Sequence, residues 1–251
     1  MKSVRVFILL IFSVVALSSY HSRAQFIDFG PARDFLEFDA HVHVGGSGVF
    51  QNYIKKFPQI RELNTMAGTS YGAGARAVFG LRDFLGLGTE LNLNLDGYSM
   101  DFAISNEDGT NISNVFLRNR YLYAHIPLFI SFRFNVSGSI RLHFDLGLYY
   151  EYGLFGKQSQ SIYSNELNEL GQLVPLNVFQ KSNYFNSTET FINSFYHSDL
   201  GLHLALGLRL GRHIMVGAKF GIGMKNISFT DGIKNPSVRN YNIWGVAGYQ
   251  F

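Results

Sequence analysis

The chain has 251 residues, a formal net charge of +3, 16% aromatic residues and no cysteine. Residues 1–24 hold three of the 21 basic side chains and no acidic one, so the rest of the chain carries 18 side chains of each sign. This balance argues against a nucleic-acid partner, and the absence of cysteine means that the fold is held without disulfides.

Residues 1–24 predict a secretory signal peptide. Lys2 and Arg5 precede an apolar run, and Ser22-Arg23-Ala24 places small residues where a signal peptidase reads them. The alternative, an N-terminal membrane anchor, is disfavoured because the apolar run is short for a spanning helix. We therefore expect one exported domain over residues 25–251. No later segment approaches the 18 consecutive apolar residues of a membrane helix.

The exported part has a repeated period of two. In "DLGLHLALGLRL", leucine occupies every second position from Leu200 to Leu210, which places all six leucines on one face of a strand. A helix would distribute them around its circumference. The same alternation predicts eight strands, in chain order, at residues 34–46, 66–80, 85–98, 115–134, 139–155, 197–210, 213–225 and 239–251.

Strand length and loop length favour a membrane barrel over a β-sandwich. The expected strands have about 11–15 residues, whereas strands of globular sheets usually have 5–6 and tilted membrane strands need 9–11. Three short turns alternate with long gaps at 47–65, 99–114, 156–196 and 226–238. Outer-membrane barrels show this asymmetry. We predict an all-β, eight-stranded antiparallel up-and-down transmembrane β-barrel with short periplasmic turns, long external loops and both termini in the periplasm.

Four segments resemble one known family. They are "YLYAHIPLFISFRFN", "RLHFDLGLYYEYGLFGK", "DLGLHLALGLRLGRHIMVGAKFGIGMKNI" and "NYNIWGVAGYQF". In this order, between Arg120 and Phe251, they are similar to the PorT-like outer-membrane β-barrels of Bacteroidetes. The resemblance implies the same barrel in the outer membrane of a Gram-negative bacterium. It also implies, as one alternative, an accessory role in type IX protein secretion.

The face opposite the apolar one carries charges at mid-strand, so in a barrel these charges would face the lumen. Acids and bases are nearly equal in number there, which predicts a paired network that fills a narrow lumen rather than an ion-selective ring. A narrow porin stays open as an alternative. The predicted network comprises Glu37, Asp39, His41, His43, Arg76, Glu90, Asp96, Arg133, Arg141, His143, Asp145, Glu151, Asp199, His203, Arg209 and Lys219, and the same parity adds His125 and Lys225.

Neither a metal site nor an active site is expected. The inward histidines and the carboxylates Asp39 and Asp145 are suitable ligand types, but they follow no compact ligand spacing. The outward faces are almost wholly apolar, and no nucleophile, base and acid gather in the sequence pattern. We therefore expect a protein without a cofactor and without enzymatic activity, which acts through structure or interaction.

Three further features of the sequence predict local structure or partners. The segment 156–196 is rich in asparagine, serine and aromatic residues; it would either extend a hairpin above the membrane or bind an extracellular or secretion-system protein. Pro127, inside a strand, predicts a bend, through a bulge or a lost ladder bond. Tyr249 and Phe251 resemble the terminal aromatic signal that barrel-assembly machinery reads. The expected partners are thus outer-membrane lipid, that machinery and a protein bound by the loops.

Overall fold

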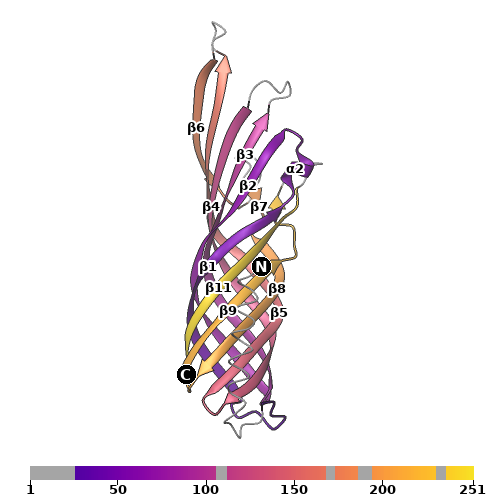
Figure 1. Ribbon diagram of the computed structural model, residues 1–251, viewed down its shortest axis with the longest axis vertical. Coiled ribbons are helices and arrows are strands. Elements are labelled where there is room, and N and C mark those ends of the chain that lie inside the picture. The colour runs from indigo at the N-terminus through magenta and orange to yellow at the C-terminus, as the bar shows by residue number, and fades with distance from the viewer. Residues whose placement is uncertain (1–25, 106–111, 168–172, 186–193, 230–235) are drawn as a thin grey trace.

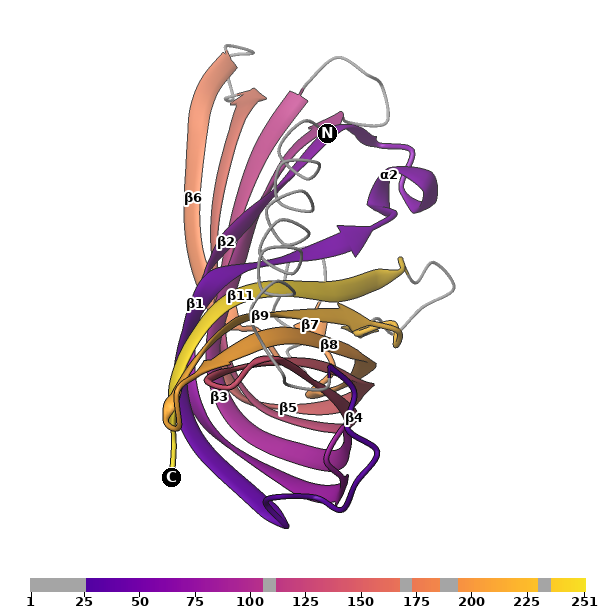
Figure 2. The ribbon, with the colours of Figure 1, turned by 60° about the horizontal axis from the view of Figure 1, so that its bottom comes forward.

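The computed structural model describes residues 26–105, 112–167, 173–185, 194–229 and 236–251. Eight antiparallel strands close into a ring (Figures 1 and 2), in which each strand pairs with its neighbours along the chain and the last pairs with the first. The predicted fold class is confirmed. The predicted signal peptide lies outside the described residues. The ring strands are β1 (Leu36–Gln51), β2 (Ile60–Arg82), β3 (Leu85–Ser105), β4 (Ile112–Ser137), β5 (Ile140–Leu167), β8 (Ser198–Leu210), β9 (Ile214–Gly223) and β11 (Val238–Gln250).

Four short or accessory elements complete the described structure. They are the one-turn helix α2 (Tyr53–Lys56), β6 (Leu173–Asn183), which pairs with β5, and the two-residue strands β7 (Ser194–Phe195) and β10 (Ser228–Phe229), which pair with each other. In the described part of the chain, no helix combines the length and the apolar character needed to cross a membrane.

Alternation along each strand separates an apolar outer surface from a polar interior. In β1, exposed Phe38, Val42 and Val44 alternate with buried Asp39 and His43. Because successive strand residues point to opposite sides, one sequence period produces both surfaces of the ring. This is the inverse of a water-soluble barrel and matches strands that meet lipid outside.

The connections between strands are short at one end of the ring and long at the other. At one end, which we call the turn end, β2–β3, β4–β5 and β8–β9 are joined by short turns, and Gly211 provides a left-handed conformation with φ of 65°. At the other end, the loop end, β1, β2, β3 and β5 run well past their predicted limits, and β4 begins three residues before its predicted start, at 112 rather than 115. The predicted gaps 47–65, 99–114 and 156–196 were therefore wrong in part, because much of each is strand.

The extra length forms a sheet that projects beyond the ring, which we call the projecting sheet. It consists of the loop-end parts of β2, β3, β4 and β5, together with β6 (Figure 1). The β1–β2 ladder stops at Ser47 opposite Gly68, whereas the β2–β3 ladder continues to Ile60 opposite Ile104. Of the two expectations for residues 156–196, the extended hairpin is the one observed for β5 and β6.

Pro127 interrupts a ladder without shifting it. The β3–β4 register is the same on both sides of a gap between the Thr89–Leu128 and Asn92–His125 pairs, and the Thr89 hydroxyl donates to the Pro127 carbonyl at 2.8 Å. Of the two predicted consequences of the proline, the lost ladder pairing is therefore the one found. The register shift in this part of the ring lies between β4 and β5, after Leu122.

Candidate functional site

The lumen is filled by the polar side chains that the sequence places on the inward parity. Of the sixteen residues predicted for the network, all are buried except Arg209, whose side chain is 16% exposed. His125 is also buried. Lys225 is not: it lies beyond the end of β9, where its ammonium group donates to Ser198 and lies over the Tyr196 ring. The inward assignment of Lys225 was wrong because the alternation ends with the strand.

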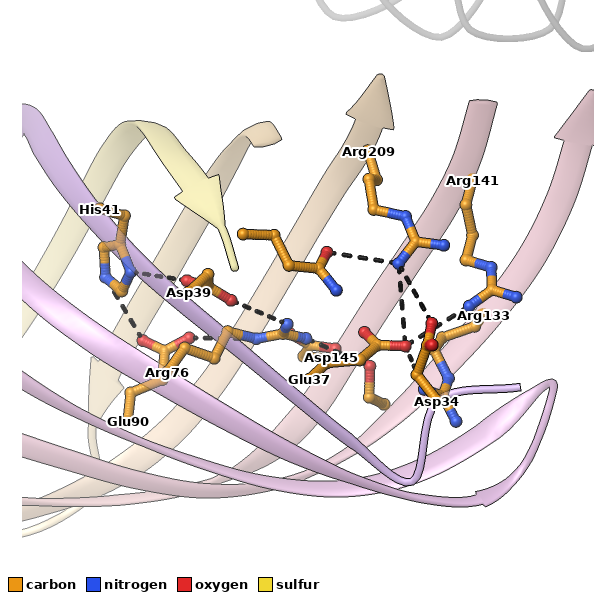
Figure 3. Close-up of polar contacts among 12 residues, drawn as sticks. Asp34, Glu37, Asp39, His41, Arg76, Glu90, Arg133, Arg141, Asp145 and Arg209 are labelled. Carbon is orange, nitrogen blue, oxygen red and sulfur yellow. Dashed lines mark hydrogen bonds and ion pairs between the residues drawn. The ribbon is translucent and has the colours of Figure 1, made fainter. Parts of the chain in front are cut away.

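These buried residues form two layers that differ in charge pairing. The paired layer, toward the turn end, contains acids matched with Arg, as Figure 3 shows, and one acid matched with Lys219. The unpaired layer, toward the loop end, contains acids with histidines and no Arg or Lys partner within ion-pair distance among the described residues. The paired layer comprises Glu37, Asp39, His41, Arg76, Asp83, Glu90, Arg133, Arg141, His143, Asp145, Arg209 and Lys219, and the unpaired layer His43, Asp96, His125, Glu151, Asp199 and His203.

Arg76 is the centre of the paired layer. Its guanidinium lies 2.9 Å from Asp145, 3.3 Å from Asp39 and 3.6 Å from Glu90, and its central carbon is 5.3 Å from the centre of the Phe129 ring. Asp145 is on β5, three strands from β2 around the ring, so these contacts cross the lumen. Burying three carboxylates inside a wall that faces lipid would cost free energy if they had no positive partner. The guanidinium of Arg76 provides that partner for all three.

Lys219 provides the second cross-lumen tie. Its ammonium group lies 2.5 Å from Glu90, and β9 and β3, which carry these residues, are diametrically opposite in the ring of eight. His41 links Lys219 to Asp39. Its Nε2 lies 2.8 Å from the Lys219 ammonium group, and its Nδ1 lies 3.1 Å from the Asp39 carboxylate. The lumen is therefore bridged by charge pairs rather than lined by them. A cavity of about 20 Å³ beside Arg76 has room for roughly one water molecule.

At the turn end, Glu37 accepts contacts from three arginines. Arg133 is 2.6 Å away, Arg141 3.4 Å and Arg209 3.9 Å. Figure 3 shows these side chains converging from separate strands of the ring. The three guanidinium groups and the Glu37 carboxylate lie together across the turn end of the lumen. Further acids of the same layer balance the positive charge that remains.

Asp83 belongs to this mouth, and the sequence reasoning missed it. It lies in the β2–β3 turn, outside the spanning strands, with Oδ1 2.8 Å from Arg141 and Oδ2 accepting from Asn135 at 3.1 Å. Burial opposes its ionised form, but the Asn135 amide and the Arg141 charge prevail and hold the pKa of Asp83 below its usual value. A turn residue has no strand parity, so the only sequence signal was its acidic character.

The unpaired layer is built on hydrogen bonds between neutral and acidic groups. His125 Nδ1 donates to Glu151 at 2.6 Å, and the Asn240 amide donates to Asp199 at 3.0 Å. Glu151 is opposite both His125 and Asp199 in the ladders, so these residues share one level of the ring. The Ser70 hydroxyl donates to Asp96 and accepts from the Trp244 indole.

Several polar atoms of this layer have no hydrogen-bond partner among the residues that the structure describes. They include Glu151 Oε2, Asp96 Oδ2 and both ring nitrogens of His203, whose ring stacks on Phe129 with centroids 5.5 Å apart. Among the described residues, no group of three or more His, Asp or Glu side chains is arranged to hold a metal ion. The unpaired layer thus contains buried donor and acceptor atoms that could form further hydrogen bonds.

An aromatic cluster, which we call the cap, lies above the unpaired layer. Tyr184 stacks on Tyr121 with ring centroids 4.6 Å apart and on Phe195 at 4.4 Å, and its hydroxyl is 3.1 Å from that of Tyr98. All four rings are buried. The cap residues are Tyr98, Tyr121, Tyr123, Tyr184, Phe185 and Phe195.

The cap changes the interpretation of the long segment 156–196. Tyr184, Phe185 and Phe195 come from that segment, which the sequence reasoning assigned to the outside, yet they are buried with rings of β3 and β4. Its high aromatic content was the available signal. Charge pairs thus cross one half of the lumen, and stacked rings lie over the other half.

Two solved structures align with most of this chain at low sequence identity. The attachment invasion locus protein Ail of Yersinia pestis aligns over 87% of this chain and all of its own, with 12% identity and a TM-score of 0.37. The protease OmpT of Escherichia coli aligns over 86% of this chain and 96% of its own, with 11% identity and a TM-score of 0.37. At this level of similarity, neither says anything of this chain's activity.

The family comparison is more direct. No curated protein matches the chain. The model of the outer membrane protein beta-barrel domain matches residues 23–228, most of the chain, and this range contains seven of the eight ring strands. The match agrees with the closed ring, the apolar outer surface and the polar lumen. The chain therefore belongs to the family of the outer membrane protein beta-barrel domain.

Proposed function

We propose that this protein is a non-enzymatic outer-membrane barrel that binds a protein partner outside the cell through its projecting sheet. The single observation that carries the proposal is the position of β6 at the edge of the projecting sheet. Among the described residues, β6 forms a ladder only with β5, and an edge strand is a site where another chain can add a strand. Short turns toward the periplasm and the projecting sheet toward the exterior are part of the proposal.

The side chains of β6 support partner binding. Phe179 is 70% exposed on one face of the strand, and Val178 and Leu176 are exposed on the opposite face. An exposed apolar edge strand is an aggregation hazard that proteins normally blunt or cover. In β6, only Pro175 and Lys181 disfavour pairing with a second copy of the same strand. The partner that fits is therefore an extended segment of another protein, which would add a strand to β6.

The closed lumen supports a scaffold rather than a channel. Arg76 and Lys219 tie opposite walls together, and the cap fills the loop end. Purified protein in a planar bilayer should therefore show no steady single-channel conductance. Steady conductance would favour the narrow porin.

The partner can be tested with a crosslinker placed in the edge strand. A photoreactive residue at Val178, in intact cells, should give a discrete protein adduct, and the same residue at the exposed position Arg239 of β11 should not. Adding Leu176→Lys should remove the adduct while heat-modifiable gel migration stays normal. No adduct at Val178, or an adduct that survives the lysine, would contradict the proposal.

The resemblance to PorT-like barrels makes an accessory role in type IX secretion the second candidate. The exposed edge of β6 suits it, because a secretion machine must hold its outer-membrane component by protein contacts. Deletion of the gene should then reduce export of cargo, measured by comparing secreted proteins. Unchanged export would exclude this role and leave the first proposal intact.

Tyr249 and Phe251 are proposed as the recognition signal for barrel assembly. The Phe251 side chain is exposed at the turn end. Its ring is tilted against that of Phe38, with centroids 5.8 Å apart, and lies T-shaped against that of Tyr249, with centroids 5.4 Å apart. Phe251→Ala should lower membrane levels several-fold while the inserted fraction keeps its heat-modifiable migration. Normal levels would contradict the assignment.

A further inference from the structure

A hollow on the outward wall of the ring lies beside two arginines. It has a volume of about 150 Å³ and is lined by residues of β2, β3 and β4, including Gly68, Thr69 and Gly97. A Cβ on Gly97 would lie 2.8 Å from the Asn119 carbonyl and 3.5 Å from the Arg120 side chain, so glycine keeps this wall open. Arg118 and Arg120, both exposed, form its border on β4.

Basic side chains continue across the neighbouring strands on the same face. Arg120 is directly opposite Lys157 on β5, and Ser159 is opposite both Arg118 and Lys181 on β6. Directly opposed like charges destabilise a sheet unless a counter-charge lies between them. None of these four basic residues makes an ion pair with a described residue, Asp101 on the outward face of β3 included.

The basic cluster lies at the edge of the apolar wall. Toward the turn end, the outward residues of β4 run from Leu122 to Phe134 without a charge, and those of β5 run from Phe155 to Leu142. A tilted strand of that length crosses roughly 25–30 Å, the height of the lipid-facing band of a barrel. Arg120 and Lys157 are the first outward charges beyond this band, at the level of lipid head groups.

We propose that this cluster and hollow bind the phosphorylated head group of a lipid in the leaflet at the loop end. Arg118 and Arg120 would hold phosphate oxygens through paired N–H donors, and Lys157 and Lys181 would add charge from the adjacent strands. The acyl chains would lie along the apolar wall below Leu122. The lipid then supplies the counter-charge that the protein lacks on this face. Apart from Lys181, the site lies on β2 to β5 and does not include β6.

The test measures lipid binding to the folded barrel in detergent by native mass spectrometry. The probes are diphosphorylated lipid A, the same lipid with both phosphates removed, and inorganic phosphate. The variant Arg118→Gln/Arg120→Gln should bind diphosphorylated lipid A at least about tenfold more weakly, because each lost charge-assisted contact is worth roughly that factor. Arg239→Gln, an exposed loop-end arginine on β11, is the matched control and should bind like the wild type.

Three results would overturn the proposal: equal binding by the double variant, equal binding of the dephosphorylated lipid, or full competition by inorganic phosphate, which would indicate a general anion site. Heat-modifiable migration of each variant shows that the barrel is folded. Arg118→Lys/Arg120→Lys retains charge without the paired donors and should fall between the two, which separates phosphate recognition from simple charge attraction. The adduct at Val178 is measured independently, so failure here leaves the partner proposal standing.

Discussion

The paired and unpaired layers of the lumen have the same origin in sequence but different means of burial. Both consist of polar residues on the inward parity of the same strands. In the paired layer each acid meets an Arg or Lys, as Glu90 meets Lys219. In the unpaired layer Glu151 meets a histidine and Asp199 an asparagine. The comparison teaches that a narrow lumen can be filled by charge compensation or by hydrogen bonding under an aromatic cover, within one barrel.

The largest effect is expected from Arg76→Met. The substitution keeps the length of the side chain but leaves Asp39 and Asp145 without their main partner, so it should destabilise the barrel by about 3–5 kcal/mol. The measurement is urea unfolding in lipid vesicles, followed by fluorescence of Trp244, the single tryptophan. Arg239→Met, in an exposed arginine, serves as the control. A cost below 1 kcal/mol would mean that the paired layer does not depend on its pairs.

The cap is the next point at which the comparison can fail. Tyr184→Ala removes a ring stacked between Tyr121 and Phe195 and should cost about 3 kcal/mol, much of it as local opening of the loop end. The readout is the rate of proteinase K cleavage next to the cap in folded protein, with Tyr163→Ala on the exposed hairpin as control. Unchanged protection would show that the unpaired layer is closed without the cap.

A smaller effect, visible in acid, is expected at the turn end. The pKa of Asp83 is below its usual value in the folded protein, so its contribution is present above the unfolded-state pKa and is lost as pH falls through the folded one. Asp83→Asn should therefore cost about 1–2 kcal/mol at neutral pH. The difference from wild type should shrink as the pH is lowered past the usual aspartate range. A difference independent of pH would contradict ionic pairing with Arg141.

The smallest effect, and the sharpest contrast with Arg76, is expected from Glu151→Gln. Glutamine keeps an oxygen that accepts from His125 and removes a carboxylate that has no Arg or Lys partner in the described structure. The free energy of unfolding should change by less than about 1 kcal/mol. Glu90→Gln is the matched change in the paired layer and should cost more. Equal costs would remove the distinction between the two layers.

The sequence carried enough to predict the ring and the inward side of each residue, because a period of two is a local property. It could not predict which charges meet. Arg76 reaches Asp145 from three strands away, and that contact depends on register and on the stagger of the closed ring. Nor could parity place Asp83, which lies in a turn, or Tyr184, which follows β6 and returns to cover the mouth.

The seam between β1 and β11 has a kinetic consequence. Its ladder joins Gln51 with Val238 and Asp39 with Gln250, and the Phe251 amide adds one more bond, to the Phe38 carbonyl at 3.0 Å. Every other ring ladder joins strands that follow one another among the ring strands, so only the seam carries contacts of maximal sequence separation. Such contacts slow folding, because loop closure precedes the energy gained from pairing. During folding, the outer edge of β1 therefore stays unpaired until β11, the most distant strand in the sequence, pairs with it.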